Sequence, residues 1–200
     1  KAQSLFDNCF EIVSGPDAPD VSIQELENEL ILYLTNTNPL SNNYEEEYSA
    51  NDPSIPTELE DGTVLSEAQR SYRFEGYLVY QLRDNAVSPS DLGDIDAARL
   101  IAQCDVQNGV SQVINYEFDP TMELSVPILE ADGQDEGIFH SMRVTTDAFA
   151  QGDNRLVNFK TYYFMVLAYG YNNYRPFNAL LGTGQDVQFK ASRKAAVGSI

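Results

Sequence analysis

The stretch that decides the fold is Leu156-Val-Asn-Phe-Lys-Thr-Tyr162-Tyr-Phe-Met-Val-Leu-Ala168-Tyr-Gly-Tyr171. Its second half consists almost entirely of aromatic and aliphatic residues, which is typical of a β-strand. Successive side chains of a strand point to opposite faces, so Phe164, Val166 and Ala168 share one face, predicted to point into a core. The opposite face is just as apolar and carries Tyr163, Met165, Leu167, Tyr169 and Tyr171.

The remaining chain is also rich in strand patterns and poor in helix patterns. Strong strands are predicted over 21–26, 29–35, 72–82 and 187–191, and weaker ones over 99–104, 112–118 and 137–145. Ser88-Pro-Ser-Asp91 has the form of a capping box with Pro at the first helical position, which predicts a short helix over 91–99. A further single turn is predicted over 147–151. The fold class is therefore all-β, an antiparallel β-sandwich with at most short helices.

The spacing of Leu156 and Tyr162 resembles the fibronectin type III pattern that leads into the sixth strand, strand F. In that family the tyrosine forms a corner, in which its hydroxyl bonds to the backbone upstream. The resemblance assigns this structural role to Tyr162, together with Leu156. It also places 15–21 before strand A, 29–34 in strand B, 72–82 in strand C and 186–191 in strand G. The chain departs from the family in having no Trp.

A domain of this family has about 100 residues, whereas this chain has 200. We therefore expect a fibronectin type III-like sandwich over 15–197, with insertions at 37–70 and 84–155. Residues 1–14 are predicted to be a linker or the end of a preceding domain. The polar stretch 36–61 is unusually long for a loop without structure of its own, so it is either mobile or pinned to the domain.

The resemblance places the strands over 72–82 and 161–171 side by side in one sheet. Tyr77, a structural residue, and Val79 are predicted to point inward. Phe74, Leu78, Tyr80 and Leu82 are predicted on the opposite face. A half-exposed antiparallel strand alternates with polar residues, and neither strand does. We expect the outer face to be covered by the 84–155 insertion or by an adjacent domain, which makes it the predicted interaction face: Tyr80, Tyr163, Met165, Leu167 and Tyr169.

The amino-acid sequence of several segments resembles that of modules in large cell-surface proteins of gliding-type Gram-negative bacteria. These segments include 97–105, 158–166 and 168–172. Such proteins are often exported by the type IX route. The resemblance implies an extracellular, outer membrane-associated location. It also implies that the partners are neighbouring domains of the same polypeptide or other surface proteins.

The charge of the chain excludes two classes of partner. Twelve basic and 31 acidic residues give a net charge of −19. Binding to nucleic acid is not expected, because no basic surface exists to neutralise phosphates. Attachment to an anionic membrane is disfavoured for the same reason, and no apolar run has the roughly 18 residues of a membrane span.

The sequence offers little material for catalysis. The only histidine, His140, is flanked by apolar residues and is more typical of a structural or solvent-facing position than of a triad. With Cys9 and Cys104 as the only cysteines, a zinc site is not expected, although the two could form one disulfide. A pair of carboxylates could hydrolyse glycosides, but this reading ranks behind a binding function. We predict that the chain is not an enzyme.

Two kinds of ligand remain open alternatives. Calcium could bind at two oxygen-rich segments, neither of which follows the EF-hand order; their candidate ligands are Asp91, Asp94, Asp96, Asp132 and Asp135. Helix capping and a hairpin turn explain the same residues. Carbohydrate could stack on Tyr169, Tyr171 and Tyr174. The main expectation is a non-catalytic structural or interaction module without cofactors, and a calcium- or carbohydrate-binding module is the alternative.

Overall fold

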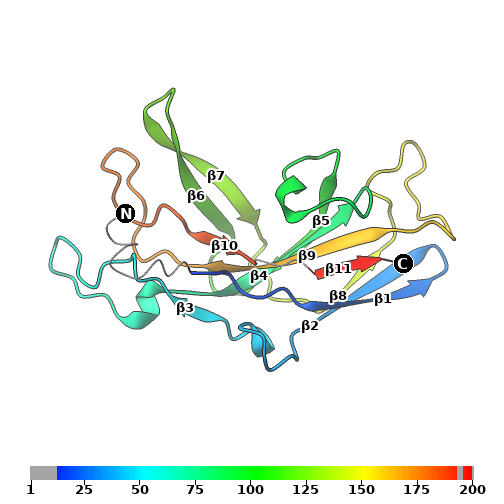
Figure 1. Ribbon diagram of the computed structural model, residues 1–200, viewed down its shortest axis with the longest axis horizontal. Helices are drawn as coiled ribbons and strands as arrows, with labels where there is room; N and C mark the ends of the chain where they lie inside the picture. Colours follow the sequence, from blue (N-terminus) through cyan, green and yellow to red (C-terminus); the bar gives the residue numbers. More distant parts are fainter. Residues whose placement is uncertain (1–12, 193–195, 200) are drawn as a thin grey trace.

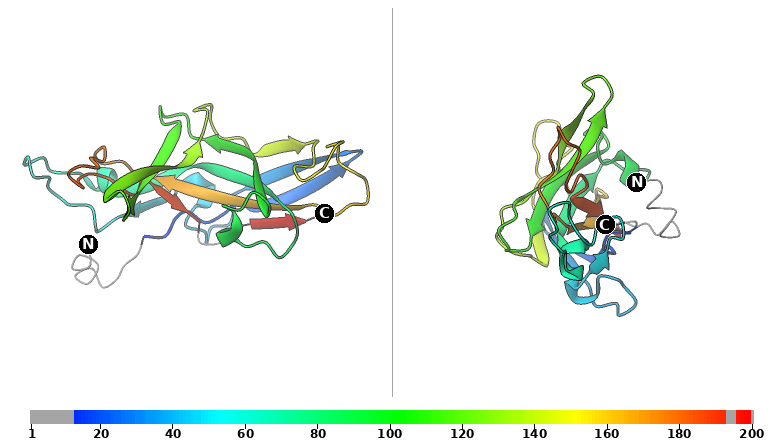
Figure 2. Two further views of the ribbon diagram at one scale, coloured as in Figure 1. Left: turned by 90° about the horizontal axis from the view of Figure 1, so that it is seen from above. Right: turned by 90° about the vertical axis from the view of Figure 1, so that its left-hand side faces the viewer.

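The computed structural model describes residues 13–192 and 196–199, and within them the chain is all-β (Figure 1). The first sheet has the order β1-β2-β8 and consists of β1 (Asp20–Leu26), β2 (Glu29–Thr35) and β8 (Ser141–Val144), all antiparallel. The molecule is elongated, and its long axis runs roughly along the strands (Figure 2).

The second sheet is built around two long central strands, β4 (Ser71–Leu82) and β9 (Tyr163–Tyr171), which pair along nearly their full length. The other edge of β4 pairs with β3 (Ser49–Asn51) and then with β5 (Ala98–Asp105). The other edge of β9 pairs with β10 (Phe189–Ala191) and then with β11 (Ala196–Ser199). All pairings are antiparallel.

Three short 3-10 helices and one separate hairpin complete the described residues. The helices are η1 (Tyr44–Glu46), η2 (Glu67–Arg70) and η3 (Pro89–Asp91). The predicted capping box is present at η3, but turns replace the rest of the predicted helix and β5 begins at Ala98. The hairpin is made of β6 (Gln112–Asp119) and β7 (Leu124–Asp132) and projects from the body (Figure 1).

The core lies between the two sheets and is formed by the apolar positions of their facing sides. β2 contributes Leu30, Leu32 and Leu34. The residues that alternate with them, Ile31 and Tyr33, point to the other face and are less buried. This is the alternation expected of a strand with one face in the core. The two central strands of the second sheet contribute Tyr72, Phe74, Tyr77, Val79, Phe164, Val166 and Ala168.

The prediction for Phe74 is wrong, because a β-bulge reverses the alternation of β4. Phe74 opposes Gly170 and Gly76 opposes Tyr169, so Glu75 is the extra residue. Phe74 therefore lies in the core, with its ring centroid 5.0 Å from that of Tyr77. Gly76 is required at the bulge, since a Cβ there would lie 2.1 Å from the backbone oxygen of Cys104.

The possible disulfide between Cys9 and Cys104 involves a residue outside the described part of the chain, since Cys9 and most of the predicted linker 1–14 are not described. Cys104 has a free thiol that is buried in the core. Burial is the main cause that raises the pKa of this thiol, and a protonated, enclosed thiol is unreactive.

Candidate functional site

The predicted interaction face of the second sheet is buried within the chain itself. Met165 is 1 % exposed, Leu167 is 6 % exposed and Tyr169 is 1 % exposed, while Tyr80 and Tyr163 are half-buried. The prediction that this face is covered is confirmed. Of the two covers that the sequence left open, the 84–155 insertion is the one found on this face, so Met165, Leu167 and Tyr169 have partners within the chain.

The cover comes from the 84–155 insertion in two parts. The base of the β6–β7 hairpin places Val113 and Ala131 against Leu78, Leu167 and Tyr169. Beside it, the segment after β4 packs Val87 and Leu92 around Met165, Leu82 and Ala98. The insertion therefore acts as a third layer on the outer side of the sandwich.

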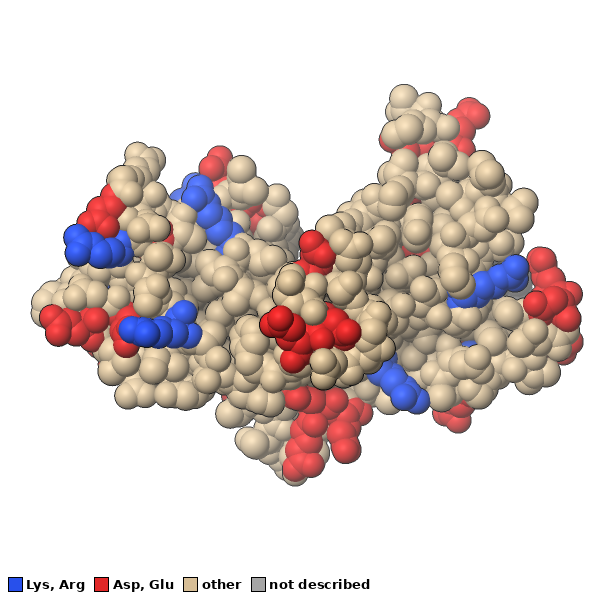
Figure 3. All heavy atoms as spheres, turned by 180° about the vertical axis from the view of Figure 1, so that it is seen from behind, with Lys and Arg blue, Asp and Glu red and all other residues tan. Residues whose placement is uncertain are grey.

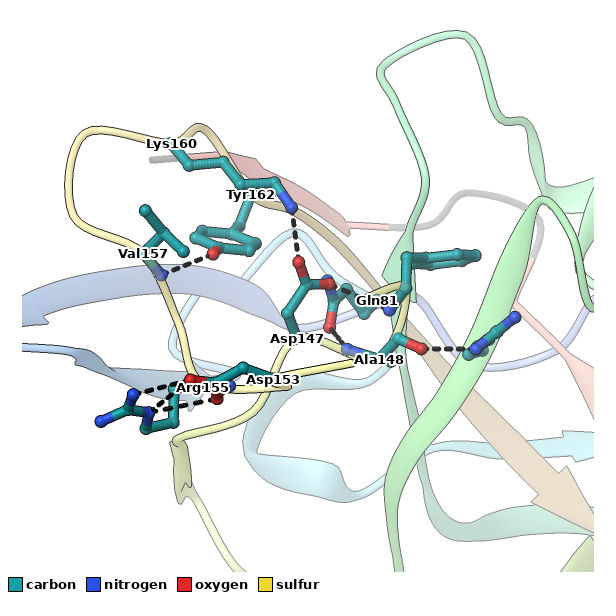
Figure 4. A network of polar contacts seen from close by, with 10 residues as sticks. Gln81, Asp147, Ala148, Asp153, Arg155, Val157, Lys160 and Tyr162 are labelled. Atoms are coloured by element: carbon teal, nitrogen blue, oxygen red, sulfur yellow. Dashed lines mark hydrogen bonds and ion pairs between the residues drawn. The ribbon is translucent and has the colours of Figure 1, made fainter. Parts of the chain in front are cut away.

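The tyrosine corner that the resemblance assigns to Tyr162 has the expected geometry (Figure 4). The Tyr162 hydroxyl accepts a hydrogen bond of 2.9 Å from the backbone N–H of Val157. Leu156 and Tyr162 are both buried in the core between the sheets. The contact closes the connection into β9, which fixes the start of the most apolar strand in the protein.

A buried carboxylate, Asp147, ties the same connection to β4 (Figure 4). Its Oδ2 accepts from Lys160 Nζ at 2.5 Å, and its Oδ1 accepts from Gln81 Nε2 at 2.8 Å. Burial alone would raise the pKa of Asp147, but hydrogen bonds from Lys160, Phe149 N–H and Gln81 outweigh it and lower the pKa. Every oxygen of this carboxylate thus has a structural partner, and the network fastens the loop rather than forming an open site.

The only histidine belongs to a chain of polar contacts that ends in the core. His140 Nε2 lies 2.8 Å from Glu46 Oε1, and the same oxygen accepts from the Tyr77 hydroxyl at 2.6 Å. Asn36 Nδ2 donates to that hydroxyl. Burial, followed by the hydrogen bond to Glu46, raises the pKa of Tyr77.

This chain of contacts explains how the long polar stretch 36–61 is held. Glu45 and Glu46 both have left-handed backbone angles, with φ of 52° and 65°. Such angles are unfavourable for residues with a side chain and persist where the surroundings fix them. Here the Tyr77 and His140 contacts hold Glu46, so the stretch is pinned against the sandwich at this point.

The five calcium candidates do not converge on one site. Among the described residues, no group of three or more His, Cys, Asp or Glu side chains could hold a metal ion. Asp91 caps η3, Asp94 accepts from the Asp96 N–H, and Asp132 accepts from Gln112. Asp135 accepts from two backbone N–H groups of the loop after β5.

A buried acidic group that the sequence did not single out lies at the root of the β6–β7 hairpin. Glu75, on the bulge of β4, is 2 % exposed and accepts two hydrogen bonds of 3.0 Å from Asn108 Nδ2. Asp105 is also buried and accepts from the Asp135 N–H at 2.9 Å. Burial is the largest cause that raises the pKa of Glu75 to about 7, and the negative charges of Asp105 and Asp135 add to it.

The aromatic platform considered for carbohydrate is not formed. Tyr169 is buried and stacks on Phe189 with ring centroids 5.1 Å apart, and Tyr171 and Tyr174 are only partly exposed. A hollow of about 330 Å³ lies elsewhere, between the β1–β2 turn and the loop over 156–162. Leu26, Leu30 and Leu156 contribute apolar walls to it, and Phe159 stands fully exposed beside it.

Large exposed apolar side chains gather instead on loops and on the hairpin. They include Phe118 and Met122 on the hairpin, Val157 and Phe159 before β9, and Leu180 and Leu181 between β9 and β10. These exposed side chains were not predicted from the sequence, because an apolar surface is recognised there only on strand faces, where the apolar pattern is regular. A lone apolar residue within a polar loop is common on protein surfaces and carries little signal by itself.

No protein-family model, no curated protein and no solved structure matches this chain. None of the helices formed by the described residues has the length and apolar character needed to cross a membrane.

Proposed function

We propose that the chain is a non-catalytic structural and interaction module of a larger extracellular or cell-surface protein assembly, with a fibronectin type III-like sandwich as its scaffold. The module contacts neighbouring domains of its own polypeptide or other surface proteins. The observation that carries this proposal is the arrangement of the 84–155 insertion. The insertion covers one sheet and then continues beyond it as a projecting hairpin with exposed apolar side chains.

Two features support the scaffold assignment. In the immunoglobulin-like plan, strands C, F and G are neighbours in one sheet, and β4, β9 and β10 pair in that order. The hydroxyl of Tyr162 also bonds upstream to Val157, as a tyrosine corner does. Both features follow from the same residues that carry the resemblance to fibronectin type III domains.

The role as a contact module rests on the contrast between the sandwich and its insertions. Side chains with catalytic potential, such as His140 and Asp147, make contacts that hold loops in place. The exposed apolar side chains lie on projecting segments, where contact with another protein buries them. With 31 acidic residues, the surface also repels other copies of the chain and favours partners that carry basic groups.

The location is tested by protease treatment of intact producing cells. If the module is at the cell surface, externally added protease removes it while a cytosolic marker survives. If it persists with the marker and is degraded only after lysis, the extracellular assignment is wrong. An activity-independent readout suits this test, because the proposed function includes no reaction.

A further inference from the structure

The β6–β7 hairpin has a face whose apolar side chains are covered only in part by the rest of the chain. Cross-strand partners share a face, so Tyr116 with Pro127 and Phe118 with Ser125 lie on one side of the ribbon. Leu129, opposite Ile114, lies on the same side. Phe118 is 65 % exposed and Leu129 is 53 % exposed, and Met122 at the tip is 62 % exposed.

The hairpin is anchored at its base and along β6 as far as Tyr116. Val113 and Ala131 at its base are buried against the second sheet. The Tyr116 ring packs on Phe177, with centroids 4.7 Å apart, so the middle of the ribbon also has a neighbour. The turn end of the hairpin projects away from the body, which Figure 1 and Figure 2 show in different orientations. A two-stranded ribbon on its own is marginally stable in water, so its exposed apolar side chains gain from burial against a partner.

The contact must be made through this face rather than by adding a strand to β7. The Tyr116 N–H donates to the Asp186 backbone oxygen at 2.7 Å, away from β7. Tyr116 and Pro127 therefore form a non-hydrogen-bonded pair, in which the nitrogen of residue 127 points to the outer edge of β7. Proline has no N–H to donate, so the middle of that edge is blocked for strand pairing.

The acidic residues around the apolar face of the hairpin indicate the charge that a partner must carry. No Lys or Arg occurs between residues 100 and 142. The hairpin carries only acidic charges, from Glu117, Asp119, Glu123, Glu130 and Asp132. Acidic side chains appear at the tip of the projecting hairpin in Figure 3. A second copy would bring the same acidic rim and is disfavoured by repulsion, whereas a rim of Lys and Arg is complementary.

From this arrangement we infer that the face of the β6–β7 hairpin that carries Phe118 and Leu129 is a docking surface for another protein that presents an apolar strip bordered by Lys and Arg. The inference rests on the proposed function and specifies its contact site. Phe118 is the central anchor, because a large aromatic side chain contributes most when it is buried in a partner. The acidic rim sets the choice of partner and speeds association.

Two synthetic amphipathic peptides test the inference against the purified chain by fluorescence titration. They share one pattern of Leu and Phe and differ only in their polar positions, which are all Lys in one peptide and all Glu in the other. We expect the Lys peptide to bind and the Glu peptide to bind at least tenfold more weakly. The double variant Phe118→Ser/Leu129→Ser weakens binding of the Lys peptide about tenfold or more, and Glu117→Gln/Glu123→Gln reduces its dependence on salt.

The control variant Val64→Ser/Leu180→Ser removes two apolar side chains elsewhere that are more exposed than Phe118 and Leu129, and it leaves binding within about twofold. All six changed side chains are exposed, so folding is preserved. The inference is overturned if Phe118→Ser/Leu129→Ser binds the Lys peptide as tightly as the unchanged chain, or if neither peptide binds. It is also overturned if sedimentation shows a dimer that the same variant dissociates, since the occupant is then a second copy. Peptide binding does not depend on cellular location, so this result and the surface-protease result can fail separately.

Discussion

The backbone N–H of Val157 donates a 2.9 Å hydrogen bond to the hydroxyl of Tyr162, five residues further along the chain. This contact joins the two ends of the exposed turn that contains Phe159, immediately before the central strand β9. Both Leu156 and Tyr162 are buried in the core between the sheets. The corner therefore fixes where β9 starts, and with it the register against β4.

Tyr162→Phe tests this corner. The change removes only the acceptor and leaves the Val157 N–H without its partner, so we expect the free energy of unfolding to fall by about 1–2 kcal/mol. Denaturant unfolding at constant m-value measures the loss. The matched control is Tyr33→Phe, which removes an exposed hydroxyl bonded to Gln24 and is expected to change stability by less than about 0.5 kcal/mol. Equal effects for the two variants would argue against a structural role for the corner.

Because the outer face of the second sheet is covered, we expect two Leu→Ala substitutions to differ strongly in their effect on the free energy of unfolding. Leu167→Ala opens a cavity beneath the base of the β6–β7 hairpin and is expected to cost about 2–4 kcal/mol in unfolding free energy. Leu129→Ala alters an exposed side chain of the same hairpin and should cost less than about 0.5 kcal/mol. If Leu167→Ala has as small an effect as Leu129→Ala in the isolated chain, the insertion does not cover the sheet.

Glu75 predicts an unusual dependence of stability on pH. Burial raises its pKa from 4.5 to about 7 in the folded chain, so the folded state binds a proton more tightly than the unfolded state. This stabilising contribution is fully present below about pH 4.5 and is lost as the pH rises through about 7. Glu75→Gln keeps the shape and removes the charge, so we expect it to raise the unfolding free energy at pH 8 by up to roughly 3 kcal/mol.

The same variant has a built-in control at lower pH. At pH 5 the Glu75 carboxyl is already protonated in the folded state, so Glu75→Gln and the unchanged chain should differ much less than at pH 8. The measurement is chemical denaturation at both pH values. A difference that is independent of pH, or a loss of stability at pH 8, would show that Glu75 is not a buried carboxylate with a raised pKa.

Calcium should leave the stability of the chain unchanged. Asp91, Asp94 and Asp132 each accept an intramolecular hydrogen bond from a nearby residue, and Asp132 lies on a different segment from the other two. Thermal unfolding in millimolar calcium and in excess chelator should therefore give the same melting temperature within about 1 °C. A ligand that binds the folded state at 100 times its Kd adds about 2.7 kcal/mol. A clear rise in melting temperature with calcium would establish the calcium-binding alternative.

The sequence was most informative where apolar residues fill both sides of a strand. Continuous apolar composition predicted β4 and β9, and also predicted that their outer face is covered. It did not show which segment covers that face, because Val113 and Ala131 of the hairpin carry no pattern that points to Leu167. The sequence therefore left two covers open, the 84–155 insertion and an adjacent domain, and the structure shows residues of the insertion packed on this face.

Local irregularities of the strands account for the other differences between the predicted and the observed structure. The bulge at Glu75 reversed the side of Phe74, and the only hint of it in the sequence is Gly76 inside a strand pattern. β7 was missed because Pro127 interrupts an otherwise strand-like segment, and proline within a run argues against a central strand. The same proline lies at the outer edge of the hairpin, where strands tolerate it.

The most direct test of the interaction module is site-specific photo-crosslinking in the producing cell. A photoreactive phenylalanine replaces Phe118 on the hairpin, and in a separate variant it replaces Ile95, which is exposed on the connection before β5. The account predicts a discrete adduct with another surface protein, or with another domain of the same polypeptide, from position 118 and none from position 95. The absence of an adduct at 118, or identical adducts from both positions, would contradict it.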